Sequence, residues 1–85
     1  MVTIKVFGTT PPCARCQRAE REARMAAERF PGQVEVHKFD ALGPEAEPYG
    51  LMATPTIIID DEVVATGKVL TADQLAPIIQ SKLGG

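Results

Sequence analysis

The chain changes from strand to helix at Cys13-Ala14-Arg15-Cys16, a Cys-x-x-Cys motif that contains both cysteines of the sequence. Two intervening residues allow both thiols to lie on one helical turn and to form a disulfide with little backbone movement. The motif can therefore exchange electrons, hold a metal ion or cross-link the fold. The residues around it have to distinguish these three uses.

The residues before the motif predict a strand, and those after it predict a helix. Residues 2–7 alternate between apolar and polar side chains, and Phe7 adds an apolar group on the second face, which indicates a central strand. Pro11-Pro12 ends this strand, because proline has no N–H for a sheet ladder. Small or apolar residues then recur at three- and four-residue steps over residues 13–30, which predicts a helix that Pro31-Gly32 ends.

The remainder of the chain predicts more strands and a closing helix. Strand patterns occur at residues 34–40, 57–59 and 63–67. Residues 43–50 predict a short helix or turn, Asp60-Asp61-Glu62 predicts a solvated hairpin turn, and Thr71 with Gln74 predicts a capping box before the last helix. Successive strand, helix and strand favour a parallel βαβ unit. The expected fold is therefore α/β: a four-stranded mixed sheet with helices on both faces.

Length, composition and charge exclude several classes of protein. A chain of 85 residues with 45% hydrophobic and 24% charged residues is expected to form one soluble domain over residues 1–85. A net charge of −2 with mixed signs provides no basic face, so nucleic acid is not an expected partner. We see no signal peptide and no apolar run near the ~18 residues that span a bilayer, which predicts a cytoplasmic protein without a membrane partner.

The position of the two cysteines predicts different roles for them. A thiolate is the reactive form of cysteine, and a helix N-terminus favours negative charge, so we expect Cys13 to be acidic and to act as the nucleophile. Cys16 lies one turn further into the helix and is expected to be the resolving thiol, which attacks a mixed disulfide on Cys13. Arg15 adds a cation to this turn, where exposure to solvent weakens its effect.

These motifs resemble the thioredoxin-like superfamily, in particular its small, glutaredoxin-sized members. The resemblance rests on Cys13-Ala14-Arg15-Cys16, Tyr49-Gly50, Thr54-Pro55-Thr56, Gly67 and Leu70-Thr71. It implies that Pro55 is a cis-proline beside the cysteine pair and that the backbone of Thr54 pairs with an extended substrate. It also implies a monomeric thiol–disulfide oxidoreductase that reduces protein disulfides without a cofactor and takes electrons from a reductase or glutathione.

The sequence departs from that resemblance near the cysteines. Typical thioredoxins carry a buried Asp six residues before the first cysteine, where this chain has Phe7. Water or the Cys13 thiolate would then have to accept the proton of Cys16. The features that hold glutathione cannot be located after Val64, and Lys68 stands where glycine is common.

Three alternatives to a redox site remain open at this point. The same two thiolates would suit Cu(I), as in a metallochaperone, although Thr54-Pro55-Thr56 and the closing helix have no counterpart in that fold. A structural disulfide would constrain only a four-residue loop, and a binding module that lost turnover would keep the fold. We expect His37 to be structural, Asp40 to be a strand-end turn residue, and Met25 to fill the core.

Overall fold

The computed structural model describes residues 1–9, 11, 13–50 and 53–84, so the predicted strand break at Pro12 lies outside the described residues. The elements follow the predicted order. They are β1 (Val2–Gly8), α1 (Ala14–Glu28), β2 (Val34–Asp40), the 3₁₀ helix η1 (Pro44–Tyr49), β3 (Thr56–Ile59), β4 (Glu62–Thr66) and α2 (Ala72–Gly84).

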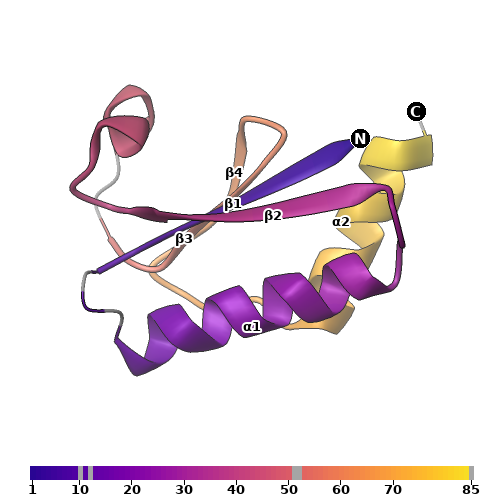
Figure 1. The fold of residues 1–85 in the computed structure, drawn as a ribbon, viewed down its shortest axis with the longest axis horizontal. Coiled ribbons are helices and arrows are strands. Elements are labelled where there is room, and N and C mark those ends of the chain that lie inside the picture. Colours follow the sequence, from indigo (N-terminus) through magenta and orange to yellow (C-terminus); the bar gives the residue numbers. More distant parts are fainter. Residues whose placement is uncertain (10, 12, 51–52, 85) are drawn as a thin grey trace.

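The four strands form one mixed sheet in the order β2-β1-β3-β4 (Figure 1). β1 pairs in parallel with β2 and antiparallel with β3, and β3 pairs antiparallel with β4. Phe7, with no exposed surface, lies on the central strand β1 as predicted. The run at residues 57–59 is likewise buried on both faces of the sheet, which confirms its assignment as an inner strand.

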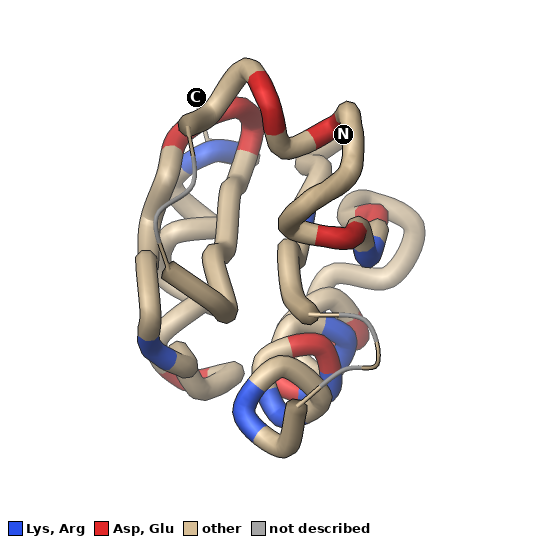
Figure 2. The backbone as a smooth tube through the Cα atoms, turned by 90° about the vertical axis from the view of Figure 1, so that its left-hand side faces the viewer, with Lys and Arg blue, Asp and Glu red and all other residues tan. Residues whose placement is uncertain are grey.

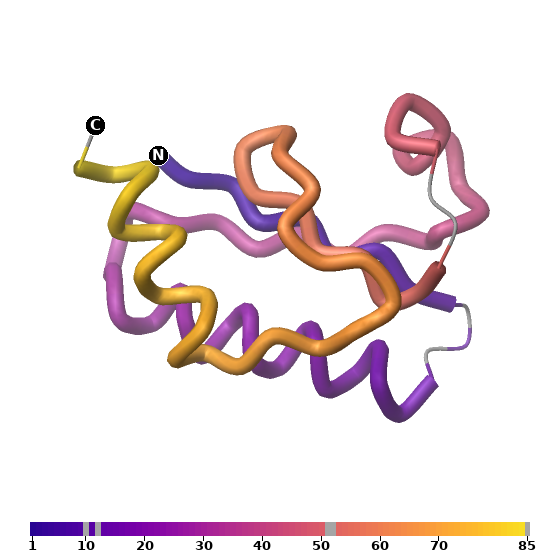
Figure 3. Tube along the Cα trace, turned by 180° about the vertical axis from the view of Figure 1, so that it is seen from behind, coloured from indigo at the N-terminus to yellow at the C-terminus, as the bar shows by residue number. Residues whose placement is uncertain are grey.

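Helices cover both faces of the sheet, as the sequence predicts. α1 and α2 lie side by side on one face, and η1 lies on the other, near the end where α1 begins (Figures 1 and 3). Val2, Ile4 and Val6 of β1 point into the larger core with both helices. Phe7 and Ile58 point the opposite way, into a second cluster under η1.

The predicted capping box opens α2. The backbone N–H of Thr71 donates to Gln74 Oε1 at 2.9 Å, and the N–H of Gln74 donates to Thr71 Oγ1 at 3.2 Å. Each side chain thus satisfies a backbone donor that the helix start leaves without an intrahelical partner.

The hairpin turn between β3 and β4 is more than the solvated turn that the sequence predicts. Asp60 and Asp61 adopt φ values of 48° and 68°, which short Asx side chains tolerate better than most residues. Asp60 Oδ1 accepts the N–H of Thr3 at 2.9 Å, and Asp61 Oδ1 accepts the hydroxyl of Tyr49 at 2.7 Å. The turn is exposed, yet these two hydrogen bonds join it to β1 and η1.

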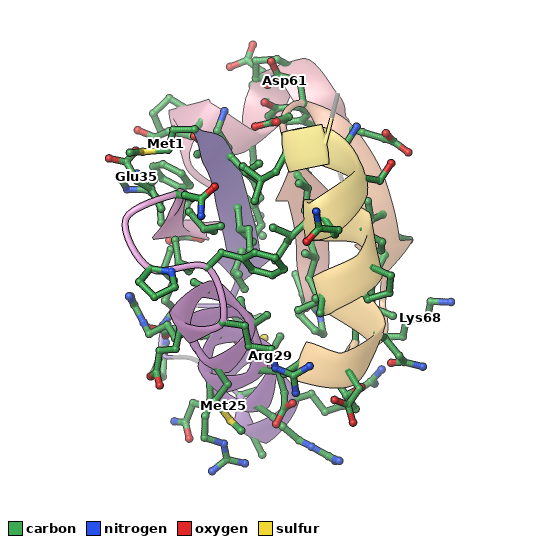
Figure 4. All side chains as sticks on the ribbon, turned by 90° about the vertical axis from the view of Figure 1, so that its right-hand side faces the viewer. Met1, Met25, Arg29, Glu35, Asp61 and Lys68 are labelled. Carbon is green, nitrogen blue, oxygen red and sulfur yellow. The ribbon has the colours of Figure 1, made fainter. Side chains whose placement is uncertain are left out.

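The prediction that Met25 fills the core is wrong, because Met25 is 46% exposed and points away from the sheet (Figure 4). The buried stripe of α1 consists of Cys16, Ala19, Ala23 and Ala26. Met25 lies on α1 outside this buried stripe. Arg29, near the end of α1, reaches Asp73 of α2 at 2.6 Å (Figure 4). Among the described residues, no helix has the length and apolar character needed to cross a membrane.

Candidate active site

The first turn of α1 is built on Cys13 itself. Cys13 is the N-cap residue, and its Sγ accepts the backbone N–H of Cys16 at 3.2 Å. The N–H of Cys13 donates to Thr9 Oγ1 at 3.1 Å, which ties the turn back to the end of β1. Cys13 is exposed, whereas Cys16 is completely buried. Cys13 is therefore the accessible thiol of the pair, and Cys16 is the sheltered one.

The two sulfur atoms lie 2.8 Å apart as free thiols, and the Cys13 thiol donates a hydrogen bond to Cys16 Sγ. Burial raises the pKa of Cys16, but hydrogen bonds from Cys13 and Thr9 outweigh burial and bring the pKa to about 7. The sequence did not indicate this lowered pKa of the resolving thiol, because it depends on contacts with Thr9 and Cys13. Because the two thiols are joined by a hydrogen bond, the ionisation of one depends on the protonation of the other.

The acidified pair predicts a specific pH dependence of stability. The pKa of Cys16 is about 7 in the folded protein, below its ordinary value of 9.0, so the stabilisation is complete above about pH 9 and is lost as the pH falls through 7. Two pKa units correspond to about 2–3 kcal/mol. The free energy of unfolding of the reduced protein, minus that of a Cys13→Ala/Cys16→Ala variant, should rise by this amount from pH 6 to 9.5 in urea titrations. Thiolate absorbance should rise with a midpoint near pH 7, and a flat stability difference would contradict the assignment.

Gly8, and not Phe7, lies against Cys16. A Cβ atom at Gly8 would be 2.9 Å from Cys16 Cβ and 3.1 Å from its Sγ, so the sheet can approach this thiol only because residue 8 has no side chain. Phe7 points to the opposite face, where its ring stacks on Phe39 with centroids 5.3 Å apart. Counting six residues back from Cys13 thus reaches a side chain that does not face the cysteines.

Thr54 and Pro55 lie at the same end of the sheet as the cysteine pair. The Thr54–Pro55 peptide bond is cis, as the resemblance implied, and Pro55 is buried. Thr56, the next residue, pairs with Phe7 of β1, so the entry to β3 lies beside the end of β1 that leads to the motif (Figures 1 and 3). The hydroxyl of Thr56 donates to the carbonyl of Ala53 at 2.6 Å and holds the chain on both sides of the proline.

A hydrogen-bonded chain joins the cysteine turn to this proline. The Arg15 guanidinium donates to the carbonyl of Gly67, and the N–H of Gly67 donates to the carbonyl of Pro55 at 2.8 Å. Gly67 has a φ of +71°, and a Cβ there would be 3.1 Å from that of Ala53. The sequence indicates only an exposed cation at Arg15, and it does not reveal the contact with Gly67 because the two residues are 52 positions apart.

Tyr49 anchors the end of η1, a role that the sequence did not reveal. Its hydroxyl accepts from Lys5 Nζ at 3.0 Å and donates to Asp61. The hydrogen bond with Tyr49 is the main reason why the pKa of Lys5 is raised and that of Asp61 lowered. These contacts hold the end of η1 against β1 and the β3–β4 turn.

Among the described residues, neither His37 nor Asp40 forms a hydrogen bond with the cysteines, although Asp40 ends β2 beside Gly8 of β1. The side chain of His37 is half exposed and lies 3.5 Å from Glu35 on the edge strand β2, which agrees with a structural role. Asp40 accepts the N–H of Leu42 at 2.9 Å, as expected of a strand-end turn residue. Within the described ranges, no three His, Cys, Asp or Glu side chains gather closely enough to hold a metal ion.

The chain is similar to thioredoxins in sequence and in structure. It matches the family model described as Thioredoxin domain over residues 2–80. A thioredoxin of Methanocaldococcus jannaschii is 36% identical over 84 residues, which are 96% of each chain, and one of Methanothermobacter thermautotrophicus is 30% identical over 93% of this chain and 99% of its own. Among solved structures, chloroplastic thioredoxin z has a TM-score of 0.81 and 26% identity, covering all of this chain and 80% of that one. A mutant thioredoxin of Halobacterium salinarum has a TM-score of 0.71 and 27% identity over 94% of this chain and 73% of that one.

Proposed function

This chain belongs to the thioredoxin domain family of thiol–disulfide oxidoreductases. We propose that it reduces disulfide bonds in protein partners by dithiol exchange at Cys13 and Cys16. One observation supports this most directly: an exposed sulfur and a buried sulfur lie 2.8 Å apart at a helix start. The exposed thiol can reach a partner, and the buried one is shielded from it. An asymmetric pair of this kind suits two successive exchange steps.

In the first step, the Cys13 thiolate attacks one sulfur of the substrate disulfide. A bond forms between Cys13 Sγ and that sulfur, the substrate S–S bond breaks, and the other substrate sulfur leaves as a thiolate that takes up a proton. The Cys16 N–H and the start of α1 stabilise the negative charge on Cys13 Sγ beforehand. Cys13 has to lose its proton before the attack, because the thiolate is the nucleophilic form of cysteine.

In the second step, Cys16 attacks Cys13 Sγ and releases the reduced substrate. The Cys13–Cys16 disulfide forms as the mixed disulfide breaks, so two electrons pass from the protein to the substrate. Among the described residues, no carboxylate forms a hydrogen bond with Cys16, so its proton has to pass to the departing substrate sulfur or to water. The hydroxyl of Thr9 lies 3.9 Å from Cys16 Sγ.

The backbone at Thr54 is the proposed docking edge for the substrate. It lies at the same end of the sheet as the cysteine turn, directly before the buried Pro55. An extended substrate segment can pair with this backbone as a short additional strand. Such pairing depends on backbone groups, which is consistent with acting on many protein sequences.

Trapping the mixed disulfide tests the proposal. Cys16→Ser keeps the exposed nucleophile and removes the resolving thiol. Reaction with insulin, whose disulfide bonds are intact, should therefore leave a covalent 1:1 adduct that mass spectrometry detects and dithiothreitol releases. Cys13→Ser is the matched control and should form no such adduct. An adduct that formed equally with both variants would contradict the assigned roles.

Copper binding by the reduced wild-type protein distinguishes the redox function from a Cu(I)-carrier function. A Cu(I) carrier would bind one equivalent of copper tightly in the reduced state and show negligible disulfide turnover.

We propose a monomer that works in the cytoplasm, where thiol pools stay reduced, and that is recharged by a reductase or by glutathione. Measuring the midpoint potential of the pair and testing both donors identifies the recharging route.

A further inference from the structure

Positive charge without a carboxylate partner gathers at the cysteine end of the molecule. Five of the nine basic side chains form ion pairs. Among the described residues, Arg15, Arg18, Arg21 and Lys68 have no such partner. Arg15 and Arg18 lie in the first turns of α1, and Lys68 follows Gly67. Figure 2 looks at this end and shows blue on the start of α1 and on the connection after β4, whereas red predominates above.

Arg15 is the one of these cations that the structure holds in place. Its guanidinium donates to the carbonyl of Gly67, which is itself bonded to Pro55. The cation is thus fixed between the cysteine turn and the proposed docking edge. Lys68, by contrast, points away from the body of the protein (Figure 4). An immobilised side chain loses less conformational entropy when it binds a ligand, so Arg15 is the better placed to select a partner.

The contact with Gly67 leaves Arg15 with binding capacity. A guanidinium has five N–H donors, and a carbonyl acceptor does not neutralise its charge. Its planar arrangement matches the two oxygens of a carboxylate. Arg15 is also exposed, so a chain lying along Thr54 can reach it.

We propose that this site favours disulfides flanked by acidic residues, and that Arg15 is the specificity-determining residue that binds a substrate carboxylate next to the attacked cysteine. The inference rests on the proposed function and adds its substrate class. An exposed pair of this kind accounts for a factor of up to about 5 in rate or affinity. The preference should fall with added salt, since the pair is accessible to counterions.

The test uses symmetrical disulfide dimers of one short peptide with Glu, Gln or Lys on both sides of its cysteine. Single-turnover reduction by the pre-reduced full chain needs no recharging enzyme. Wild type should reduce the Glu peptide about 5-fold faster than the Lys peptide at low ionic strength, with Gln between them. Arg15→Met should bring the three rates within about 2-fold, Arg15→Lys should keep part of the preference, and Arg21→Met, the matched loss of one unpaired charge, should retain it.

The outcomes separate this inference from the function on which it rests. Wild type that reduces none of the peptides overturns the proposed function. Wild type that reduces all three equally, or Arg15→Met and Arg21→Met variants that lose the preference to the same extent, overturn the role of Arg15. Arg15→Met that slows all three peptides by the same factor shows that Arg15 only holds Gly67, and also overturns the specificity.

Discussion

Cys13→Ser is expected to lower the rate of insulin reduction by at least about 10³-fold, which is the scale seen when an enzyme loses its nucleophile. A serine hydroxyl cannot form the mixed disulfide, and the remaining thiol, Cys16, has no exposed surface from which to attack a protein. Gly8 and Thr9 enclose it on the side of the sheet. Turbidity from the precipitating insulin chains, with dithiothreitol as the reductant, measures the rate.

The control for this experiment has to separate lost chemistry from lost folding. Cys13 is exposed and Ser is a good N-cap residue, so Cys13→Ser should keep the helix start and the thermal midpoint of the reduced protein. Iodoacetamide should modify wild type at a single position at pH 7 and leave this variant unmodified in the folded state. Turnover by Cys13→Ser at the wild-type rate would overturn the assignment of the nucleophile.

The fold was predictable because local patterns and long-range packing agree. Alternation in residues 2–7 and 34–40, the β-branched run at 57–59 and the capping box at Thr71 each indicate the element that forms. The motif and the cis-proline also carry local signatures. The two signals were independent of each other and led to the same end of the sheet.

The contacts that complete the site were not predictable, because they depend on tertiary placement. Gly8, at the end of β1, and Thr9, which follows it, lie against Cys16 of α1. The carbonyl of Gly67 accepts a hydrogen bond from Arg15, which is 52 positions away in the sequence. Polar residues in turns are common, so nothing in the sequence distinguishes Thr9 from any other. The face of the sheet to which Phe7 points depends on the alternation of side chains along β1. Counting residues back from Cys13 does not reveal that face.

Phe7→Asp tests that facing, and it should unfold the protein at pH 7 without assisting the cysteines. Phe7 has no exposed surface and lies between Phe39 and the Tyr49 ring, with centroids 5.3 and 5.8 Å away. Losing a buried Phe costs about 3–5 kcal/mol, and an unpaired buried charge adds several more. The total approaches the ~5–15 kcal/mol that stabilises a typical domain.

The pH dependence identifies the cause of the loss. Burial among apolar rings raises the pKa of the introduced carboxyl above its unfolded value of about 3.9, so the variant is most stable below that pH and loses stability as the pH rises. Phe7→Asn introduces a side chain of nearly the same shape as Asp but without charge, so this variant should lack the pH dependence. Phe7→Leu should lower the free energy of unfolding by only about 1 kcal/mol. Lys5 lies two residues away on the same face, but its Nζ is already held by Tyr49 and Asp61. Urea unfolding from pH 3.5 to 7.5 measures these differences. If Phe7→Asp instead folded normally at pH 7 and shifted the thiolate titration, residue 7 would face the cysteine pair, and the proton of Cys16 would have the carboxylate route that Gly8 and Thr9 do not provide.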